Sequence, residues 1–170
     1  MLTQEKKENC MNLMANETLI RTPVAYLEPI AKVMSNYVNG ASRGLDFGSG
    51  DGHFCMNMSW MLNMPFDGIE ANPELLAKAQ ANVSKNCRFF GADFSRPIQV
   101  PDLSEYDVAY NFCDTNPEKR KEAIELVIQR LLESRKRPVL VALSGTNADI
   151  GIEASRSYRV GKHMLNVYKF

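Results

Sequence analysis

The sequence has few cysteines, and they are far apart. Its four cysteines include no C-x-x-C pair; they are Cys10, Cys55, Cys87 and Cys113. Structural zinc sites and the disulfide frameworks of small secreted domains need closely or regularly spaced cysteines. We therefore expect neither a metal site nor a disulfide framework, and the spacing favours a reducing compartment.

Net charge and long hydrophobic runs are also absent. The 20 Lys and Arg residues balance the 20 Asp and Glu residues, so no overall field attracts the chain to nucleic acid or to an anionic membrane. No apolar stretch reaches membrane-spanning length, and residues 1–20 carry polar and charged groups throughout, unlike a secretory signal. We expect a soluble cytoplasmic protein without a membrane partner, which recognises any charged partner locally.

What the sequence does have is material for one hydrophobic core. A chain of 170 residues with 45% hydrophobic content is too short for two ordinary domains. There is no internal repeat and no low-complexity linker. We expect residues 1–20 to form an N-terminal extension and residues 21–170 to form a single domain.

Short apolar runs alternate with segments of helical periodicity along most of the chain. The expected strands cover residues 44–47, 66–70, about 87–91, 106–112 and 139–143, and the expected helices cover residues 23–38, 53–62, 72–83 and 116–131. Strands 156–160 and 163–170 are joined by Gly161 and Lys162 alone, which predicts an antiparallel hairpin. The pattern predicts an α/β fold with one Rossmann-like, doubly wound, mostly parallel sheet that ends in this hairpin.

The strongest motif is a glycine-rich segment after the first expected strand, with Gly48, Gly50 and Gly52 at alternate positions. Glu70 ends the next strand, where a carboxylate in a nucleotide-binding unit accepts hydrogen bonds from ribose hydroxyls. The spacing is GxGxG rather than the GxGxxG of dinucleotide sites, and Asp46 and Asp51 flank it. Two carboxylates repel a pyrophosphate but favour the ammonium and sulfonium of S-adenosylmethionine. The motif therefore favours S-adenosylmethionine over a dinucleotide.

The run LDFGSGDGHF at residues 45–54 resembles motif I of class I methyltransferases, and GIEANPELLAKAQAN resembles the segment after that motif. The resemblance implies a methyltransferase fold over residues 22–170 that binds S-adenosylmethionine. It implies contacts to the methionine end, the ribose and the adenine. The residues implied for these contacts are Asp46, Gly48, Ser49, Gly50 and Gly52 for the methionine end, Glu70 for the ribose, and Ala71, Asn72, Asp93 and Phe94 for the adenine.

Within that family, the sequence is most similar to the short protein-lysine methyltransferases of archaea and their mitochondrial relatives that modify an ATP synthase ring subunit. The shared features are the Arg21-Thr22-Pro23 element, the GSGDG loop and the E-x-N-P-E-L segment. The fourth expected strand departs from that group, because residues 110–114 read YNFCD rather than an aromatic, leucine-rich segment. The acceptor implied by the resemblance is a protein lysine.

Ligands of open α/β sheets bind beyond the carboxyl ends of the strands. We therefore expect residues 111–114 to form the floor of the acceptor pocket, with Asn111 and Asp114 as catalytic candidates and Asn111 also near the cofactor. Thr22 is expected to close the site beside the cofactor. The segment lacks the paired prolines common in adenine-modifying enzymes, and Cys113 is read as a small buried residue rather than a nucleophile.

The leading hypothesis is methyl transfer from S-adenosylmethionine to a macromolecular acceptor, with a protein lysine as the favoured one. Two alternatives stay open: a methyltransferase acting on RNA or a small molecule, and a non-catalytic module that keeps the fold and binds a cofactor or partner. Net charge gives no support to a nucleic-acid partner. The sequence does not indicate an oligomeric state.

Overall fold

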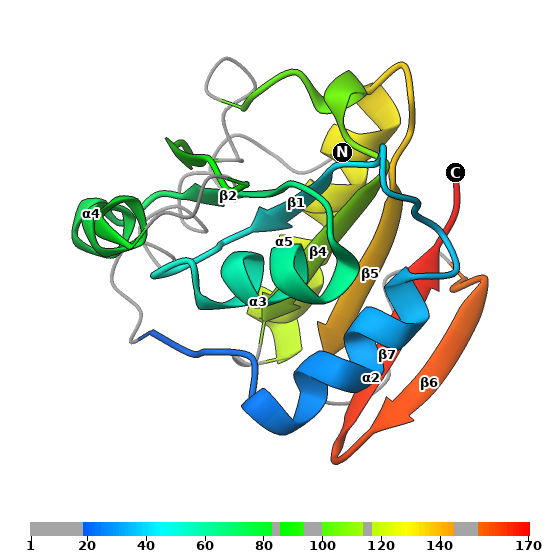
Figure 1. Ribbon diagram of the computed structural model, residues 1–170. Helices are drawn as coiled ribbons and strands as arrows, with labels where there is room; N and C mark the ends of the chain where they lie inside the picture. Colours follow the sequence, from blue (N-terminus) through cyan, green and yellow to red (C-terminus); the bar gives the residue numbers. More distant parts are fainter. Residues whose placement is uncertain (1–18, 83–85, 94–99, 114–116, 145–152) are drawn as a thin grey trace.

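A computed structural model describes residues 19–82, 86–93, 100–113, 117–144 and 153–170. Helices and strands alternate through most of the chain (Figure 1). The helices are α2 (Val24–Met34), α3 (His53–Leu62), α4 (Pro73–Ala81), the 3₁₀ turn η2 (Leu103–Glu105) and α5 (Pro117–Glu133). The strands are β1 (Gly44–Phe47), β2 (Phe66–Glu70), β3 (Phe89–Gly91), β4 (Val108–Cys113), β5 (Val139–Ser144), β6 (Arg156–Val160) and β7 (His163–Tyr168).

One seven-stranded sheet has the order β3-β2-β1-β4-β5-β7-β6. The pairs from β3 to β5 are parallel, whereas β7 runs antiparallel to both β5 and β6. This confirms the predicted Rossmann-like sheet with its C-terminal antiparallel hairpin. The strand order reverses between β1 and β4, which is where open α/β sheets bind ligands at the carboxyl edge.

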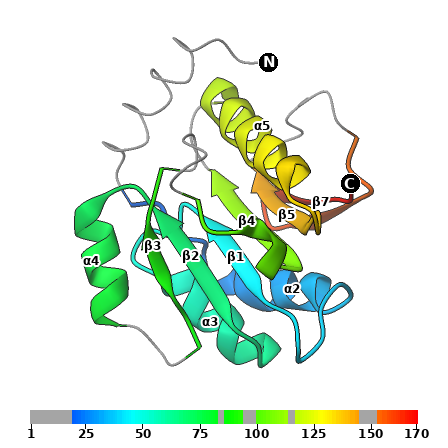
Figure 2. The same ribbon diagram turned by 90° about the horizontal axis from the view of Figure 1, so that it is seen from above.

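The sheet separates two hydrophobic layers (Figure 2). On one face, apolar side chains of α2, α3 and α4 form one cluster with side chains of the sheet such as Tyr110 and Val141. On the other face, α5 packs against Leu45, Phe47 and Ala109. Neighbouring residues of β1 and β4 therefore belong to opposite layers, as strand geometry requires. This alternation decides which side chains of a strand can reach a site beside α3.

Several element boundaries differ by two or more residues from those expected. The first helix ends at Met34 rather than near residue 38, because the side chains of Ser35 and Asn36 donate to the Lys32 carbonyl and compete with further helical turns. The third strand starts at residue 89 and the fourth at residue 108. The residues just before β4 form the 3₁₀ turn Leu103–Glu105 instead of extending the strand.

Asn72 caps α4 as the sequence predicts. Its side-chain oxygen accepts hydrogen bonds from the amides of Glu74 at 2.9 Å and Leu75 at 3.3 Å, and Pro73 occupies the first turn. The end of β2 is thereby connected rigidly to the next helix. Among the described residues, no helix has both the length and the apolar character needed to cross a membrane.

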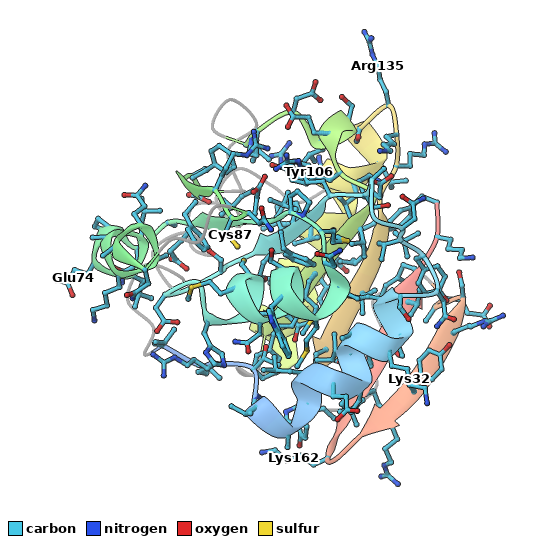
Figure 3. All side chains as sticks on the ribbon, viewed as in Figure 1. Lys32, Glu74, Cys87, Tyr106, Arg135 and Lys162 are labelled. Carbon is cyan, nitrogen blue, oxygen red and sulfur yellow. The ribbon has the colours of Figure 1, made fainter. Side chains whose placement is uncertain are left out.

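A charged network fastens the amino edge of the sheet. The fully buried Asp67 of β2 accepts hydrogen bonds from Arg43 Nη1 at 2.9 Å, Arg88 Nη2 at 2.7 Å and the Tyr106 hydroxyl at 3.0 Å. Figure 3 shows Tyr106 at the end of the molecule opposite Lys162, whose hairpin turn lies at the carboxyl edge. Burial and the neighbouring Asp67 raise the pKa of Tyr106, which keeps its proton for this hydrogen bond.

Candidate functional site

The glycine loop connects β1 to α3 through a sharp turn. Gly48, Gly50 and Gly52 have φ angles of 84°, 56° and 82°, values that L-residues with a Cβ rarely adopt. The amides of Gly48 and Ser49 both donate to the Ile69 carbonyl at 2.9 Å, so the loop is tied to the end of β2. The result is a bare stretch of backbone at the carboxyl edge of the central strands, where a ligand can approach closely.

Glu70 holds the loop from the neighbouring strand. Its side chain is 9% exposed, its Oε2 accepts from the Gly50 amide at 2.8 Å, and its Oε1 accepts from the Asn72 amide at 2.7 Å. A carboxylate has about four lone-pair sites, so each oxygen can still accept another hydrogen bond. Glu70 therefore positions the loop and retains capacity for a ligand hydroxyl.

Asp46 lies on the α3 side of the sheet beside Tyr110, its partner in the β1–β4 register. Only 3% of Asp46 is exposed, and the Cys55 thiol donates to its Oδ2 at 3.8 Å. Burial raises the pKa of Asp46 well above its ordinary value, and the nearby Glu70 raises it further. A cation placed between these carboxylates would lower that pKa and stabilise both charges.

The chain segment before α2 crosses this loop. A Cβ on Gly50 would lie 2.6 Å from Leu19 Cδ1, and the Arg21 guanidinium forms an ion pair with Asp51. Thr22 Oγ1 lies 2.9 Å from the Tyr110 hydroxyl, and both groups are buried. The segment leaves a cavity of about 30 Å³ above the loop. Its walls are Leu19, Ile20, Arg21, Thr22, Asp46, Gly48, Ser49, Gly50, Asp51, His53, Phe54, Tyr110 and Phe112.

Aromatic rings form one wall of the cavity. The Phe54 and Tyr110 rings stack with centroids 3.7 Å apart and an interplanar angle of 12°. Phe112 follows on the same face of β4 and meets the His163 ring edge-on at 5.7 Å. His163 is buried and lies 3.4 Å from the Tyr26 hydroxyl. The pocket is therefore lined by both acidic and aromatic residues.

The structure brings together most of the residues expected around the cofactor. Five of them line the cavity, and Gly52 and Glu70 belong to the same loop and its support. Ala71 and Asn72 directly follow β2, and Asp93 lies just beyond β3. Phe94 and Asp114 lie outside the described residues. The five cavity residues are Thr22, Asp46, Gly48, Ser49 and Gly50.

Asn111 takes a different position from the one expected. Its Nδ2 donates to the Phe47 carbonyl at 2.8 Å, and the residue is 4% exposed. It alternates with Tyr110 and Phe112 along β4, so it does not line the cavity that they line. Its Oδ1 is buried without a hydrogen-bond partner among the described residues. The catalytic and cofactor-binding roles of Asn111 stay predictions.

Comparison with known proteins gives a family. Residues 39–155 match the model of a methyltransferase domain. That match covers more than half of the chain and contains the glycine loop, Glu70 and β4. The chain belongs to the methyltransferase domain family. No curated protein matches the sequence.

Several solved structures share the fold of this methyltransferase at low identity. An RNA methyltransferase from Salinibacter ruber, in complex with S-adenosyl-L-homocysteine, is 18% identical, has a TM-score of 0.68, and the match covers 88% of this chain and 93% of that one. A SAM-dependent methyltransferase from Aquifex aeolicus is 18% identical with a TM-score of 0.61, and the match covers 96% of this chain and 97% of that one. A tRNA (m1A58) methyltransferase from the same organism is 21% identical with a TM-score of 0.54, and the match covers 82% of this chain and 54% of that one. These similarities confirm the class I methyltransferase fold.

Replacing Asp46 by asparagine is expected to stabilise the ligand-free methyltransferase at high pH. Burial raises the pKa of Asp46 in the folded protein above its value in the unfolded chain. Folding is therefore not penalised at pH values below the ordinary aspartate pKa, and the protein loses stability as pH rises from there through the folded-state pKa. Asparagine carries no such penalty and still offers an oxygen to Cys55. At pH 8 the melting temperature of the asparagine variant should exceed that of the wild type, by about 2–4 °C for each kcal/mol by which the free energy of unfolding increases.

Thermal melts between pH 5 and pH 8 measure this effect. The advantage of the asparagine variant should shrink as pH falls toward the ordinary aspartate pKa of about 3.9. Glu28→Gln makes the same change of charge on an exposed side chain of α2 and should show little pH-dependent difference from wild type. An advantage that grows on acidification would contradict the raised pKa.

Proposed function

We propose that this methyltransferase transfers a methyl group from S-adenosylmethionine to the side-chain amine of a protein lysine, in the cytoplasm, through a domain covering residues 21–170. The observation that carries the cofactor is the combination of a bare glycine loop with Glu70 fastened to its centre and Asp46 buried beside it. Dinucleotide sites share a ribose-binding carboxylate like Glu70, but they place amides and a helix N-terminus against a pyrophosphate, which a neighbouring carboxylate such as Asp46 would repel.

The residues present fit this cofactor. The loop has no Cβ at Gly48, Gly50 or Gly52, and the Ser49 hydroxyl is buried without a hydrogen-bond partner among the described residues. Glu70 can accept from ribose hydroxyls, and Asp46 is placed for the ammonium group. When bound, S-adenosylmethionine supplies an electrophilic methyl group on a sulfonium. The chain's own contribution is to hold this end of the molecule and to shape the route of the acceptor.

The aromatic wall supports an amine acceptor. Phe54, Tyr110 and Phe112 offer rings to a lysine side chain, and aromatic faces attract a cation. A pocket with little water lowers the pKa of an amine, so the acceptor nitrogen can lose its proton before it attacks. S-adenosylmethionine would supply the methyl group, and the amine, after releasing its proton to solvent, would supply the electron pair of the new N–C bond. The main requirement of the protein is alignment at about 3 Å.

RNA is the second candidate acceptor, and the structure from Salinibacter ruber supports it, because that protein is an RNA methyltransferase with this fold. The balanced charge of the present chain argues for the protein acceptor, since RNA-binding domains are usually basic. The two candidates predict different labelled products, and a single experiment separates them.

The test is methyl transfer from methyl-labelled S-adenosylmethionine into a cell extract. Label should enter the protein fraction, resist ribonuclease, and be recovered as methylated lysine after acid hydrolysis. Loss of label on ribonuclease treatment would support RNA instead. Transfer into small molecules, or binding of S-adenosylhomocysteine without any transfer, would overturn the lysine proposal. Glu70→Ala protein in the same extract controls for endogenous enzymes.

A further inference from the structure

The pocket above the glycine loop has an imbalance of charge. Asp46 and Asp51 line it and Glu70 supports it, whereas Arg21 is the only Lys or Arg side chain among its described lining residues. The amino-acid end of S-adenosylmethionine has both an ammonium and a carboxylate. The acidic groups suit the ammonium, but they repel a carboxylate unless a cation stands beside it. The lining residues provide one guanidinium for that purpose.

The structure holds Arg21 at the mouth of the pocket. Its Nε donates to Asp51 Oδ1 at 3.3 Å, its Nη2 contacts Asp51 Oδ2, and its side chain is 56% exposed. Partial burial raises the pKa of Asp51, but the hydrogen bond and charge of Arg21 outweigh this, and the pKa lies below its ordinary value. Asp51 is therefore ionised at neutral pH and pairs with Arg21 through a two-pronged carboxylate contact.

The crossing segment is anchored on both sides of Arg21. Leu19 packs over Gly50, and Thr22 hydrogen-bonds Tyr110. With Arg21 paired to Asp51, the cavity beneath the segment is only about 30 Å³, far below the roughly 300 Å³ or more of ordinary small-molecule sites. A ligand at the loop has to displace part of this segment, and solvent around the exposed Arg21 side chain weakens its ion pair.

We propose that Arg21 binds the α-carboxylate of the cofactor's amino-acid end, exchanging Asp51 for the ligand. This inference rests on the proposed function. The planar guanidinium presents the same pair of N–H donors to either carboxylate, so the exchange keeps a two-pronged contact. Asp51 in the ligand-free protein acts as a stand-in that keeps Arg21 at the pocket. The crossing segment thereby connects ligand recognition to closure over the loop.

The experiment compares two ligands by calorimetric titration: S-adenosylhomocysteine and its decarboxylated analogue, which keeps the adenosine, the thioether and the amine. Arg21→Gln should weaken S-adenosylhomocysteine binding about tenfold or more, as expected for a lost hydrogen bond between charged groups. The same variant should change the affinity for the decarboxylated analogue less than about twofold. Arg21→Lys keeps the charge but loses the paired N–H donors of the guanidinium, so its affinity for S-adenosylhomocysteine should lie between those of the wild type and Arg21→Gln.

Lys32→Gln makes an equal change of charge on an exposed side chain of α2 and should alter neither affinity (Figure 3). Equal losses for both ligands in Arg21→Gln would assign Arg21 a purely structural role and overturn the inference. Asp51→Asn removes the competitor for Arg21, so the ratio of the affinity for S-adenosylhomocysteine to that for the decarboxylated analogue should stay unchanged or rise. A fall in that ratio matching that of Arg21→Gln would also overturn the inference. Failure of the folded wild type to bind either ligand would instead overturn the proposed function.

Discussion

Replacing Glu70 by glutamine is expected to weaken S-adenosylhomocysteine binding about 100-fold. Both oxygens of Glu70 accept backbone amides, from Gly50 at 2.8 Å and Asn72 at 2.7 Å. Glutamine offers one oxygen and one NH₂ group, so one of these amides would face a donor. Hydrogen bonds to charged groups contribute about 1.5–3 kcal/mol each, and about 1.4 kcal/mol changes affinity tenfold. The variant loses a loop contact and an acceptor for ribose together.

Calorimetric titration measures this loss, with circular dichroism to confirm that the variant is folded. Glu74→Gln is the matched control, because Glu74 points away from the protein in the first turn of α4 and its side chain is exposed (Figure 3). The control should bind within about twofold of wild type, as expected for a site that shares no partner with the pocket. Binding of the Glu70 variant within about threefold of wild type would leave Glu70 with no role in the cofactor site.

The sheet was largely predictable because its elements satisfy local rules. The run Val139–Ser144 is apolar up to its last residue, and its last five residues are buried, as expected for a central strand covered by helices on both faces. Asn72 and Pro73 mark a helix start through capping, a local effect. The boundaries that moved lie where other interactions compete with periodicity, such as the side-chain hydrogen bonds after Met34.

The candidate site was predictable only where a motif is continuous in sequence. The glycine loop and Glu70 can be recognised from the sequence alone, by the glycine spacing and by the position of Glu70 at the end of the next strand. Arg21 and Tyr110 do not, because their contacts join residues 30 and 88 positions apart, Arg21 to Asp51 and Thr22 to Tyr110. For β4, the sequence indicates a strand but not which side chains face α3; the pairing of Asp46 with Tyr110 decides that. That pairing places Tyr110, rather than Asn111, beside the cavity.

Stability and ligand binding draw on opposite edges of the sheet. At the carboxyl edge, carboxylates such as Asp46 are buried without a basic partner in hydrogen-bond contact among the described residues, at a cost in stability. At the amino edge, the buried Asp67 has two arginines and a tyrosine hydroxyl. The same residue type therefore has basic partners at the amino edge and none in hydrogen-bond contact beside the glycine loop, among the described residues.

Replacing Asp67 by alanine is accordingly expected to destabilise the protein by about 3 kcal/mol, the usual cost of removing one partner from a buried ion pair. Besides its ion pairs, Asp67 accepts the Arg88 amide at 2.9 Å and the buried Tyr106 hydroxyl at 3.0 Å. Arg43 and Arg88 are partly exposed and can return to water. Tyr106 cannot, so its hydroxyl would lose this buried acceptor.

Urea unfolding measures this loss, and the exposed end of the same network supplies the control. Glu105 pairs with Arg88 at 2.9 Å with half of its side chain exposed, and Glu105→Gln should cost less than about 1 kcal/mol. At a temperature where both variants are folded, each should bind S-adenosylhomocysteine within about twofold of wild type, because the network lies at the edge away from the glycine loop. A loss of affinity in Asp67→Ala that Glu105→Gln does not share would show that the two edges are coupled through β2, whose far end carries Glu70.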